Sequence, residues 1–412
     1  MVSVALASLL DLGAPALEPE YLYTLSVDGS HGGLHLHGPT PDSSDGAGPN
    51  AMAVNSKGEI VIADWGSRGF TIRTYTREGR PSWSIPPPSD LGFSQYSALA
   101  RCEDGSVYAY ELTSSYTCAR YDANGNFQWR EGLGGPVVGS QPDVVPQARL
   151  DGSLWTRFFD ARDGSAVVEA DGTVKPVPDV DVGSPVPDGD VLVEQPAQPD
   201  RYVRRSSGGA ESEVRLRSTA DMLAPGRGFP SLDAGGRMTR WTWHPSPYPR
   251  SLASGNRITT ELVLTRYDRD GTPLAQVRLA GAPPMCALGS FALAPNGDAY
   301  CLIYDWDRVH LVRVPLSRTT GTYVALSLAP RLTIEGRTYV PLASATWGMP
   351  VRWDAKAKVV SVSGKSLSGR SKEAKVIEGR VWVTRLGAQL LGLRLDWHPK
   401  GFYAYVSRRK AV

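Results

Sequence analysis

The sequence predicts a mainly β protein in which six four-stranded units form a six-bladed β-propeller, followed by a small α+β domain. Three observations carry this prediction. Glycine turns recur in pairs, the runs between them are rich in valine and aromatic residues, and a different repeat occupies the C-terminal region. A length of 412 residues also exceeds what one hydrophobic core usually organises.

Each predicted unit contains two tight turns, and glycine supplies the positive φ that such turns need. In the first four units the paired glycines are 21, 20, 20 and 20 residues apart (58→79, 105→125, 152→172, 189→209). The fifth pair is 35 residues apart (236→271) because of an insertion near Pro245–Asn256. The first turns contain Gly58, Gly105, Gly152, Gly189, Gly236 and Gly297, and the second turns contain Gly79, Gly125, Gly172, Gly209 and Gly271.

Four short strands are expected in each unit, and the second unit shows them best. Their alternating apolar pattern is typical of half-buried strands. The first strand of several units consists of small residues, as in Asn50–Val54, which suits sheets that converge on a central axis. The second unit is expected to contain strands at Tyr96–Arg101, Ser106–Leu112, Tyr116–Tyr121 and Phe127–Gly132.

The sixth unit lacks one strand, because no second turn follows its third strand at Val309–Leu316. The run Tyr21–Val27 has the character of the missing strand. We therefore expect this N-terminal run to pair with the last unit and close the ring.

The repeat segments Gly48–Asn55 and Gly58–Asp64 resemble NHL-type six-bladed propellers. The resemblance covers residues 20–316 loosely, best in units one, two and six, and least in unit four at Val186–Leu216. Gluconolactonases and streptogramin lyases have propellers of this general kind, so the resemblance keeps an enzyme of lactonase or lyase type as the alternative function.

A twofold repeat with a spacing of 43 residues begins after the last propeller unit. Ile334–Leu342 is matched by Ile377–Arg385, and each copy continues through a short helix-like segment into strands that contain Trp353 or Trp397. The predicted order is a β-hairpin, a short helix and two strands, twice.

Gly336–Leu342, Trp353-Asp354 and Lys358–Val360 resemble the copper amine oxidase N-terminal-like domain, the stalk domain of bacterial surface and secreted proteins. The second copy departs from that pattern at Thr384-Arg385 and at Asp396. The resemblance covers about 328–407 and implies a non-catalytic spacer or adhesion module at the cell envelope.

Amine oxidase activity itself is not expected. That chemistry needs a tyrosine in an Asn-Tyr context, and the chain contains no Asn-Tyr dipeptide. His35 and His37 have the spacing of a metal-binding pair and lie near His31, but no third ligand has suitable spacing. We predict a polar loop there, with no catalytic residues, no metal site and no cofactor.

The predicted division of the chain is residues 1–19 as a possible truncated signal segment, 20–318 as the propeller, 319–327 as a linker and 328–412 as the stalk domain. Val2–Leu10 is an apolar run followed by Ala14-Pro15-Ala16, which resembles a secretory signal without its basic start. An ordinary N-terminal segment is the alternative. The apolar run and the stalk resemblance predict an extracellular or cell-envelope location.

Charge and cysteine content exclude some classes of function. Lys and Arg number 44 against 42 Asp and Glu, which argues against a nucleic-acid-binding surface, and no stretch has the length of a transmembrane segment. Four cysteines do not form a disulfide scaffold. Cys102 and Cys118 are expected on non-adjacent strands as buried free thiols.

The connections between second and third strands are rich in aromatic and charged residues, and in a propeller they emerge on one face. Such residues suit sugar stacking or peptide capture, so the predicted function is a non-catalytic binding protein with a carbohydrate or peptide ligand. The alternative for each ring is packing between blades. The candidate ligand-binding residues are Trp65, Arg68, Phe159, Trp241, Trp243, Tyr304 and Trp306.

Overall fold

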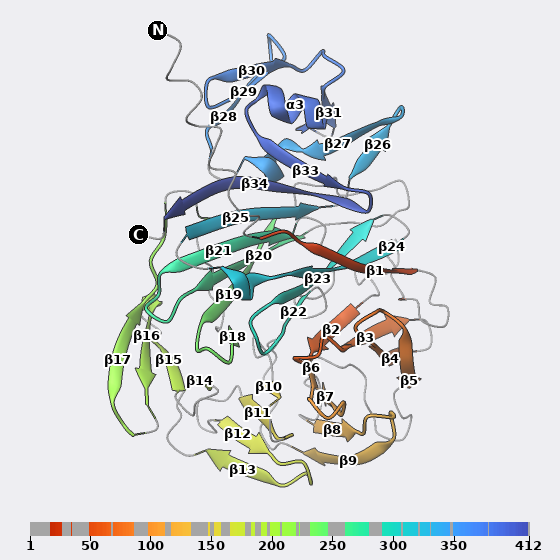
Figure 1. Cartoon of the computed structure of the whole chain (residues 1–412), viewed down its shortest axis with the longest axis vertical. Coiled ribbons are helices and arrows are strands. Elements are labelled where there is room, and N and C mark those ends of the chain that lie inside the picture. Colours follow the sequence, from red (N-terminus) through yellow and green to blue (C-terminus); the bar gives the residue numbers. More distant parts are fainter. Residues whose placement is uncertain are drawn as a thin grey trace.

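Strands dominate the computed structural model of the chain, with only short helices among the described residues (Figure 1). The prediction of a mainly β, propeller-like fold is confirmed. The structure describes residues 17–26, 34, 49–66, 69–85, 98–111, 117–132, 147–148, 152–157, 165–177, 183–185, 191–195, 198–206, 208–219, 222, 231–245, 260–279, 291–305, 308–319, 322–329, 331–346, 349–377 and 379–410.

Within the described residues, six four-stranded antiparallel units lie around a common centre (Figure 1). Units one and two are β2 (Pro49–Val54), β3 (Ile60–Gly66), β4 (Gly69–Tyr75), β5 (Pro81–Ile85), and β6 (Ala98–Arg101), β7 (Val107–Glu111), β8 (Thr117–Tyr121), β9 (Phe127–Gly132). Units three and four are β10 (Gln147–Ala148), β11 (Leu154–Arg157), β12 (Ser165–Val168), β13 (Val174–Val177), and β14 (Gly183–Pro185), β15 (Val191–Gln195), β16 (Gln198–Arg205), β17 (Glu211–Arg215). Units five and six are β18 (Ser231–Leu232), β19 (Met238–Pro245), β20 (Thr260–Tyr267), β21 (Pro273–Leu279), and β22 (Phe291–Leu293), β23 (Ala299–Asp305), β24 (Arg308–Val314) with β1 (Glu20–Ser26).

The turns between these strands are the ones that the glycine spacing predicts. Every predicted turn glycine that the structure describes has a positive φ, from +69° at Gly236 to +93° at Gly172. Gly189 lies outside the described residues.

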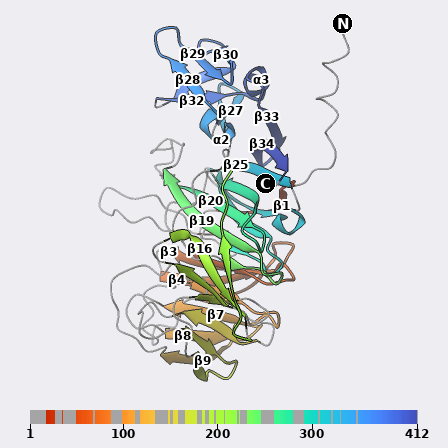
Figure 2. The ribbon, with the colours of Figure 1, turned by 90° about the vertical axis from the view of Figure 1, so that its left-hand side faces the viewer.

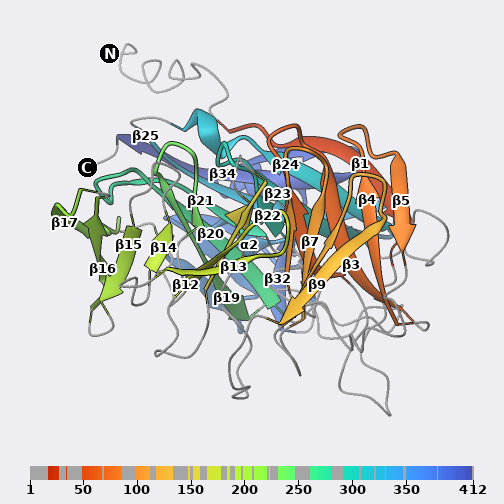
Figure 3. The same cartoon turned by 90° about the horizontal axis from the view of Figure 1, so that it is seen from below.

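The N-terminal strand completes the sixth unit, as predicted. β1 pairs antiparallel with β24, from Glu20 opposite Arg313 to Ser26 opposite Arg308 (Figure 3). Arg313 holds the pair together, since its guanidinium contacts Glu20 at 3.1 Å and the buried Asp298 at 2.7 Å. A strand from the start of the chain thus covers the edge that the last unit would otherwise expose.

Neighbouring units share a repeated contact in which the outer strand of one unit packs on the second turn of the next. The indole N–H of Trp83 donates to the Ala123 carbonyl at 2.8 Å, and the indole N–H of Trp129 donates to the Ala170 carbonyl at 2.9 Å. Tyr23 of β1 makes the equivalent contact at the closure, where a Cβ added to Gly79 would lie 2.2 Å from its ring. The closing strand therefore packs on unit one as the outer strands of units one and two pack on their neighbours.

The fifth unit is part of a larger, seven-stranded sheet with the order β18-β19-β20-β21-β25-β34-β33. β25 (Thr322–Ala329) runs parallel to β21, and β34 (Gly401–Lys410) then pairs antiparallel with β25. This corrects the expected linker at 319–327. After the 3₁₀ helix η2 (Leu316–Arg318), most of that segment is a buried strand whose apolar side chains, including Val324, Leu326 and Leu328, join the core of units five and six.

The C-terminal region, which we call the C-terminal module, repeats a hairpin, a short helix and further strands (Figure 2). The order follows the predicted repeat, with β30 as an additional strand. Its elements before β34 are β26 (Leu332–Ile334), β27 (Arg337–Pro341), α2 (Leu342–Ala345), β28 (Val351–Asp354), β29 (Val359–Val362), β30 (Lys365–Ser368), β31 (Ala374–Ile377), β32 (Arg380–Val383), α3 (Arg385–Leu390) and β33 (Arg394–His398).

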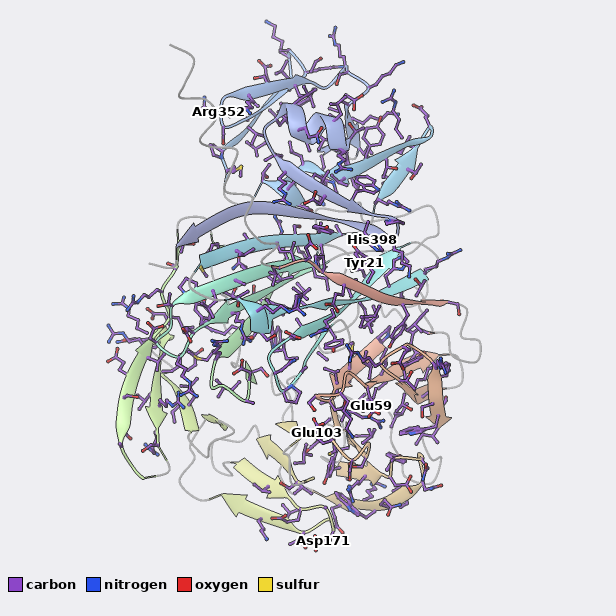
Figure 4. The ribbon with its side chains drawn as sticks, in the orientation of Figure 1. Tyr21, Glu59, Glu103, Asp171, Arg352 and His398 are labelled. Atoms are coloured by element: carbon purple, nitrogen blue, oxygen red, sulfur yellow. The ribbon has the colours of Figure 1, made fainter. Side chains whose placement is uncertain are left out.

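The C-terminal module also touches the closing strand of the ring. The rings of Tyr21 in β1 and His398 in β33 stack with centroids 4.0 Å apart and planes 2° apart (Figure 4). One hydrophobic cluster includes Leu25 and Ile60 of the ring together with Tyr339 and Trp382 of the C-terminal module. The two parts therefore share one core.

Candidate functional site

Three of the residues predicted as a binding site lie at one rim of the ring, where the second strand of each unit ends. Because the units repeat around a common centre with the same strand order, their second strands run in the same direction and end at the same rim. Trp65 lies one residue before the end of β3, Trp243 two before the end of β19 and Tyr304 one before the end of β23. The backbone thus brings these three positions, from units one, five and six, to one rim.

Trp241 does not lie at that rim, which corrects its prediction as a ligand-binding residue. Its side chain is only 7% exposed and packs against Phe291 of unit six, with ring centroids 6.1 Å apart. In the sheet it lies opposite Leu264, so strand alternation turns it toward the apolar core between units five and six. The alternative of packing between blades is correct for this ring.

The remaining predicted residues lie outside what the structure describes. Arg68, Phe159 and Trp306 are in undescribed segments, as are the three histidines of the N-terminal loop, His31, His35 and His37. Among the described residues, no group of three or more His, Cys, Asp or Glu side chains could hold a metal ion.

The structure adds two buried carboxylates at this rim that the sequence analysis missed. Asp64, near the end of β3, is fully buried and lies 3.5 Å from the guanidinium of Arg73 in β4. Glu261, near the start of β20, is also fully buried and lies 2.5 Å from the guanidinium of Arg278 in β21. In both cases the arginine comes from the neighbouring strand. Arg73 lies two positions from Thr71, which is opposite Asp64, and Arg278 lies opposite Val263, two positions from Glu261.

Desolvation dominates the electrostatics of Glu261. Burial raises the pKa of its carboxyl, while the charges of Arg278 and Arg380 oppose that rise. Arg278 also donates to the Ala343 carbonyl at 2.8 Å, which ties the end of unit five to α2 of the C-terminal module. A buried ion pair of this kind positions backbone more effectively than it adds stability.

These pairs could have been suspected from sequence only with the strand register in hand. Asp64 and Arg73 are nine residues apart, and Glu261 and Arg278 are seventeen residues apart. These separations predict a contact only when the pairing of the strands is known. Chemically, the rim combines aromatic positions at strand ends with carboxylates already held by arginine. Aromatic residues at strand ends suit ring stacking on a ligand, whereas the two carboxylates are fully buried and belong to the fold.

The cysteines that the structure describes match the expectation of buried free thiols. Cys102, Cys118 and Cys301 are buried and unpaired. Cys102 follows β6 and Cys118 lies in β8, with β7 between them, so these two residues are on non-adjacent strands as predicted.

No protein-family model matches the chain, and no curated protein sequence matches it. Among solved structures, it is similar to a streptogramin B lyase, with 15% identity over 72% of this chain and 98% of the lyase and a TM-score of 0.40. It is also similar to a gluconolactonase from Xanthomonas campestris, with 14% identity over 72% of this chain and 98% of that one and a TM-score of 0.34. TolB from Acinetobacter baumannii shows 11% identity over 57% of this chain and 56% of TolB, with a TM-score of 0.35. Likenesses this distant carry no argument about what this chain does.

Within the part of the chain that the structure describes, no helix has both the length and the apolar character needed to cross a membrane.

Proposed function

We propose that the protein is a non-catalytic binding protein that works outside the cytoplasm, at or near the cell envelope, and that its ring captures a carbohydrate or peptide. One observation carries this proposal: Trp65, Trp243 and Tyr304 come from three units and lie at the ends of second strands that reach the same rim. Aromatic residues at such positions suit stacking on sugar rings or on apolar peptide side chains.

The C-terminal module serves in this proposal as the spacer or anchor. The support is the repeated order of hairpin, helix and strands, together with the resemblance of Gly336–Leu342 to stalk domains. The shared sheet and the contact between Arg278 and Ala343 hold the module in a fixed orientation to the rim. A ligand at the rim would then be presented in a defined direction.

The test is a glycan and peptide array screen of the full chain, followed by titration of the best ligand against variants. Trp65→Ala combined with Trp243→Ala should weaken binding at least tenfold, because a stacked ring contributes roughly 1–3 kcal/mol. The matched control is Phe127→Ala, which removes a ring that is 46% exposed on β9 of unit two. It should leave the affinity unchanged.

The outcome that contradicts the proposal is equal binding by the double variant and the wild type. Turnover of a lactone or of a streptogramin by the wild-type chain would also contradict it and would favour the enzyme alternative. A cytoplasmic result on fractionation of the native host would refute the envelope location.

A further inference from the structure

The C-terminal module carries an exposed strand edge on which two large apolar residues alternate with two charged ones. Large apolar side chains are unusual at an exposed edge because natural proteins protect such edges. β28 is an outer strand of the three-stranded sheet β28-β29-β30, at the end of the molecule away from the ring (Figure 2). All four of its residues are exposed, including Val351 at 42% and Trp353 at 39%. The outer strand β17, by contrast, has charged residues at three of its five positions, which is the usual protection.

The two apolar residues of β28 extend the buried face of this sheet beyond its edge. Trp353 lies opposite Val360 and Val351 lies opposite Val362, and both of these β29 valines are fully buried. The indole of Trp353 is held in place on Gly369, where an added Cβ would lie 2.9 Å from the ring. An additional strand along β28 would therefore continue an apolar surface that is already formed.

The backbone of β28 is oriented to accept such a strand. Ser363 donates from its backbone N–H to the Pro350 carbonyl, and Gly369 donates to the Lys358 carbonyl. Along β29 the odd-numbered residues therefore point their backbone groups at β28 and the even-numbered ones at β30. Arg352 and Asp354, which lie opposite Ser361 and Val359, point theirs at β29. The backbone N–H and C=O groups of Val351 and Trp353 consequently face the open edge.

The charges of β28 are complementary to those of a second, antiparallel copy of the same strand. If two copies pair about Trp353, the two Trp353 residues exchange backbone hydrogen bonds across the twofold axis. Arg352 of each copy then lies opposite Asp354 of the other, in the closer, non-hydrogen-bonded type of pair where side chains interact best. Figure 4 shows Arg352 at the margin of the C-terminal module, and it forms no ion pair with any residue that the structure describes.

We propose that β28 is a homodimerisation edge, through which two copies of the chain join their three-stranded sheets into one continuous antiparallel sheet. The two Arg352–Asp354 ion pairs and the apposed Trp353 residues fix the register. The contact is short, so it buries less area than a standard stable interface, and the dimer should be weak and concentration-dependent. This inference is independent of what the ring binds.

Sedimentation velocity of the full chain tests the proposal, at concentrations up to about 200 μM, which cover micromolar dissociation constants. The wild type should dimerise, and added salt should weaken the dimer because it screens the ion pairs. Arg352→Asp places two acidic residues opposite each other, and Asp354→Arg places two basic ones, so each variant alone should dimerise at least tenfold more weakly. An equimolar mixture of the two variants restores both ion pairs and should form a heterodimer.

Circular dichroism and thermal melting check that both variants are folded, because Asp354 also accepts hydrogen bonds from the backbone N–H groups of Lys356 and Ala357. If Asp354→Arg does not fold, Val351→Lys replaces it as the second disrupting variant and should also weaken the dimer. A wild type that stays monomeric throughout would overturn the proposal, even if a different protein binds this edge. A dimer that Arg352→Asp leaves intact would overturn it as well.

Discussion

The closure of the ring depends on how closely Tyr23 approaches Gly79, and substituting this glycine measures the contact. Gly79 has a φ of +81°, and a Cβ at this position would lie 2.2 Å from the Tyr23 ring. Alanine should therefore incur two costs. The left-handed backbone costs roughly 1–2 kcal/mol, and forcing a methyl group against a buried ring costs roughly 1–3 kcal/mol.

Gly209 provides a matched control because it occupies the equivalent turn of unit four. Its φ is +83°, and no described atom lies within 4 Å of an added Cβ. Gly209→Ala should therefore show only the backbone cost. The expected difference between the two alanine variants is about 1–3 kcal/mol in the free energy of unfolding, measured by urea denaturation.

A double-mutant cycle separates the contact from other effects. Tyr23→Ala should itself destabilise the fold by about 3–5 kcal/mol, because it removes a buried aromatic ring. In that background, Gly79→Ala should cost no more than Gly209→Ala does, since the ring that it clashes with is gone. Equal costs for the two glycine variants in the wild-type background, or an unchanged cost without Tyr23, would refute the argument that β1 closes the ring through this contact.

Two further predictions follow from buried titratable groups. Asp298 is fully buried; desolvation raises its pKa, but hydrogen bonds from Ser317 and Arg313 outweigh burial and hold the pKa below the ordinary 3.8. The ionised form of Asp298 therefore stabilises the fold at neutral pH, and this contribution is lost as the pH falls below about 4. Asp298→Asn should destabilise the protein at pH 7 by about 3 kcal/mol and should weaken the loss of stability at acid pH. Urea denaturation at several pH values measures this, and a variant with the same acid-side loss of stability as the wild type would contradict the prediction. Burial raises the pKa of the Cys102 thiol to about 11, so iodoacetamide at pH 8 should alkylate Cys102 only after unfolding. Peptide mass spectrometry measures the modification, and alkylated Cys102 in the native protein would contradict this prediction.

Much of the ring could be predicted because its signals are local. A tight turn between two short strands needs a residue with positive φ, so glycines such as Gly105 and Gly125 mark the hairpins directly. The pairing of β1 with β24 is distant in sequence, yet counting turns reveals that one strand is missing. The predicted boundaries of the second unit agree with β6–β9 to within a few residues for the same reason.

The errors arose where a residue's surroundings are set by distant parts of the chain. Thr322–Ala329 follows the last turn signal and was expected to begin as a linker, but its partner β21 is more than 40 residues earlier and pairs with it in parallel. Trp241 is an aromatic residue close in sequence to the rim residue Trp243, and only the strand register shows that it faces the core. The buried Asp64 and Glu261 escaped notice because their arginine partners lie on other strands.

The parallel pairing of β25 with β21 has a consequence for how the protein is made. During synthesis the ring emerges first, and unit five then carries an uncovered outer strand until β25 leaves the ribosome and pairs with it. The free edge of β25 in turn stays unpaired until β34 is synthesised, and β34 contains the last residues that the structure describes. A chain that stops early would therefore present an open, apolar strand edge to other nascent chains. For the same reason, cutting between residues 327 and 328 would divide β25 itself, so the ring and the C-terminal module should be produced and studied as one piece.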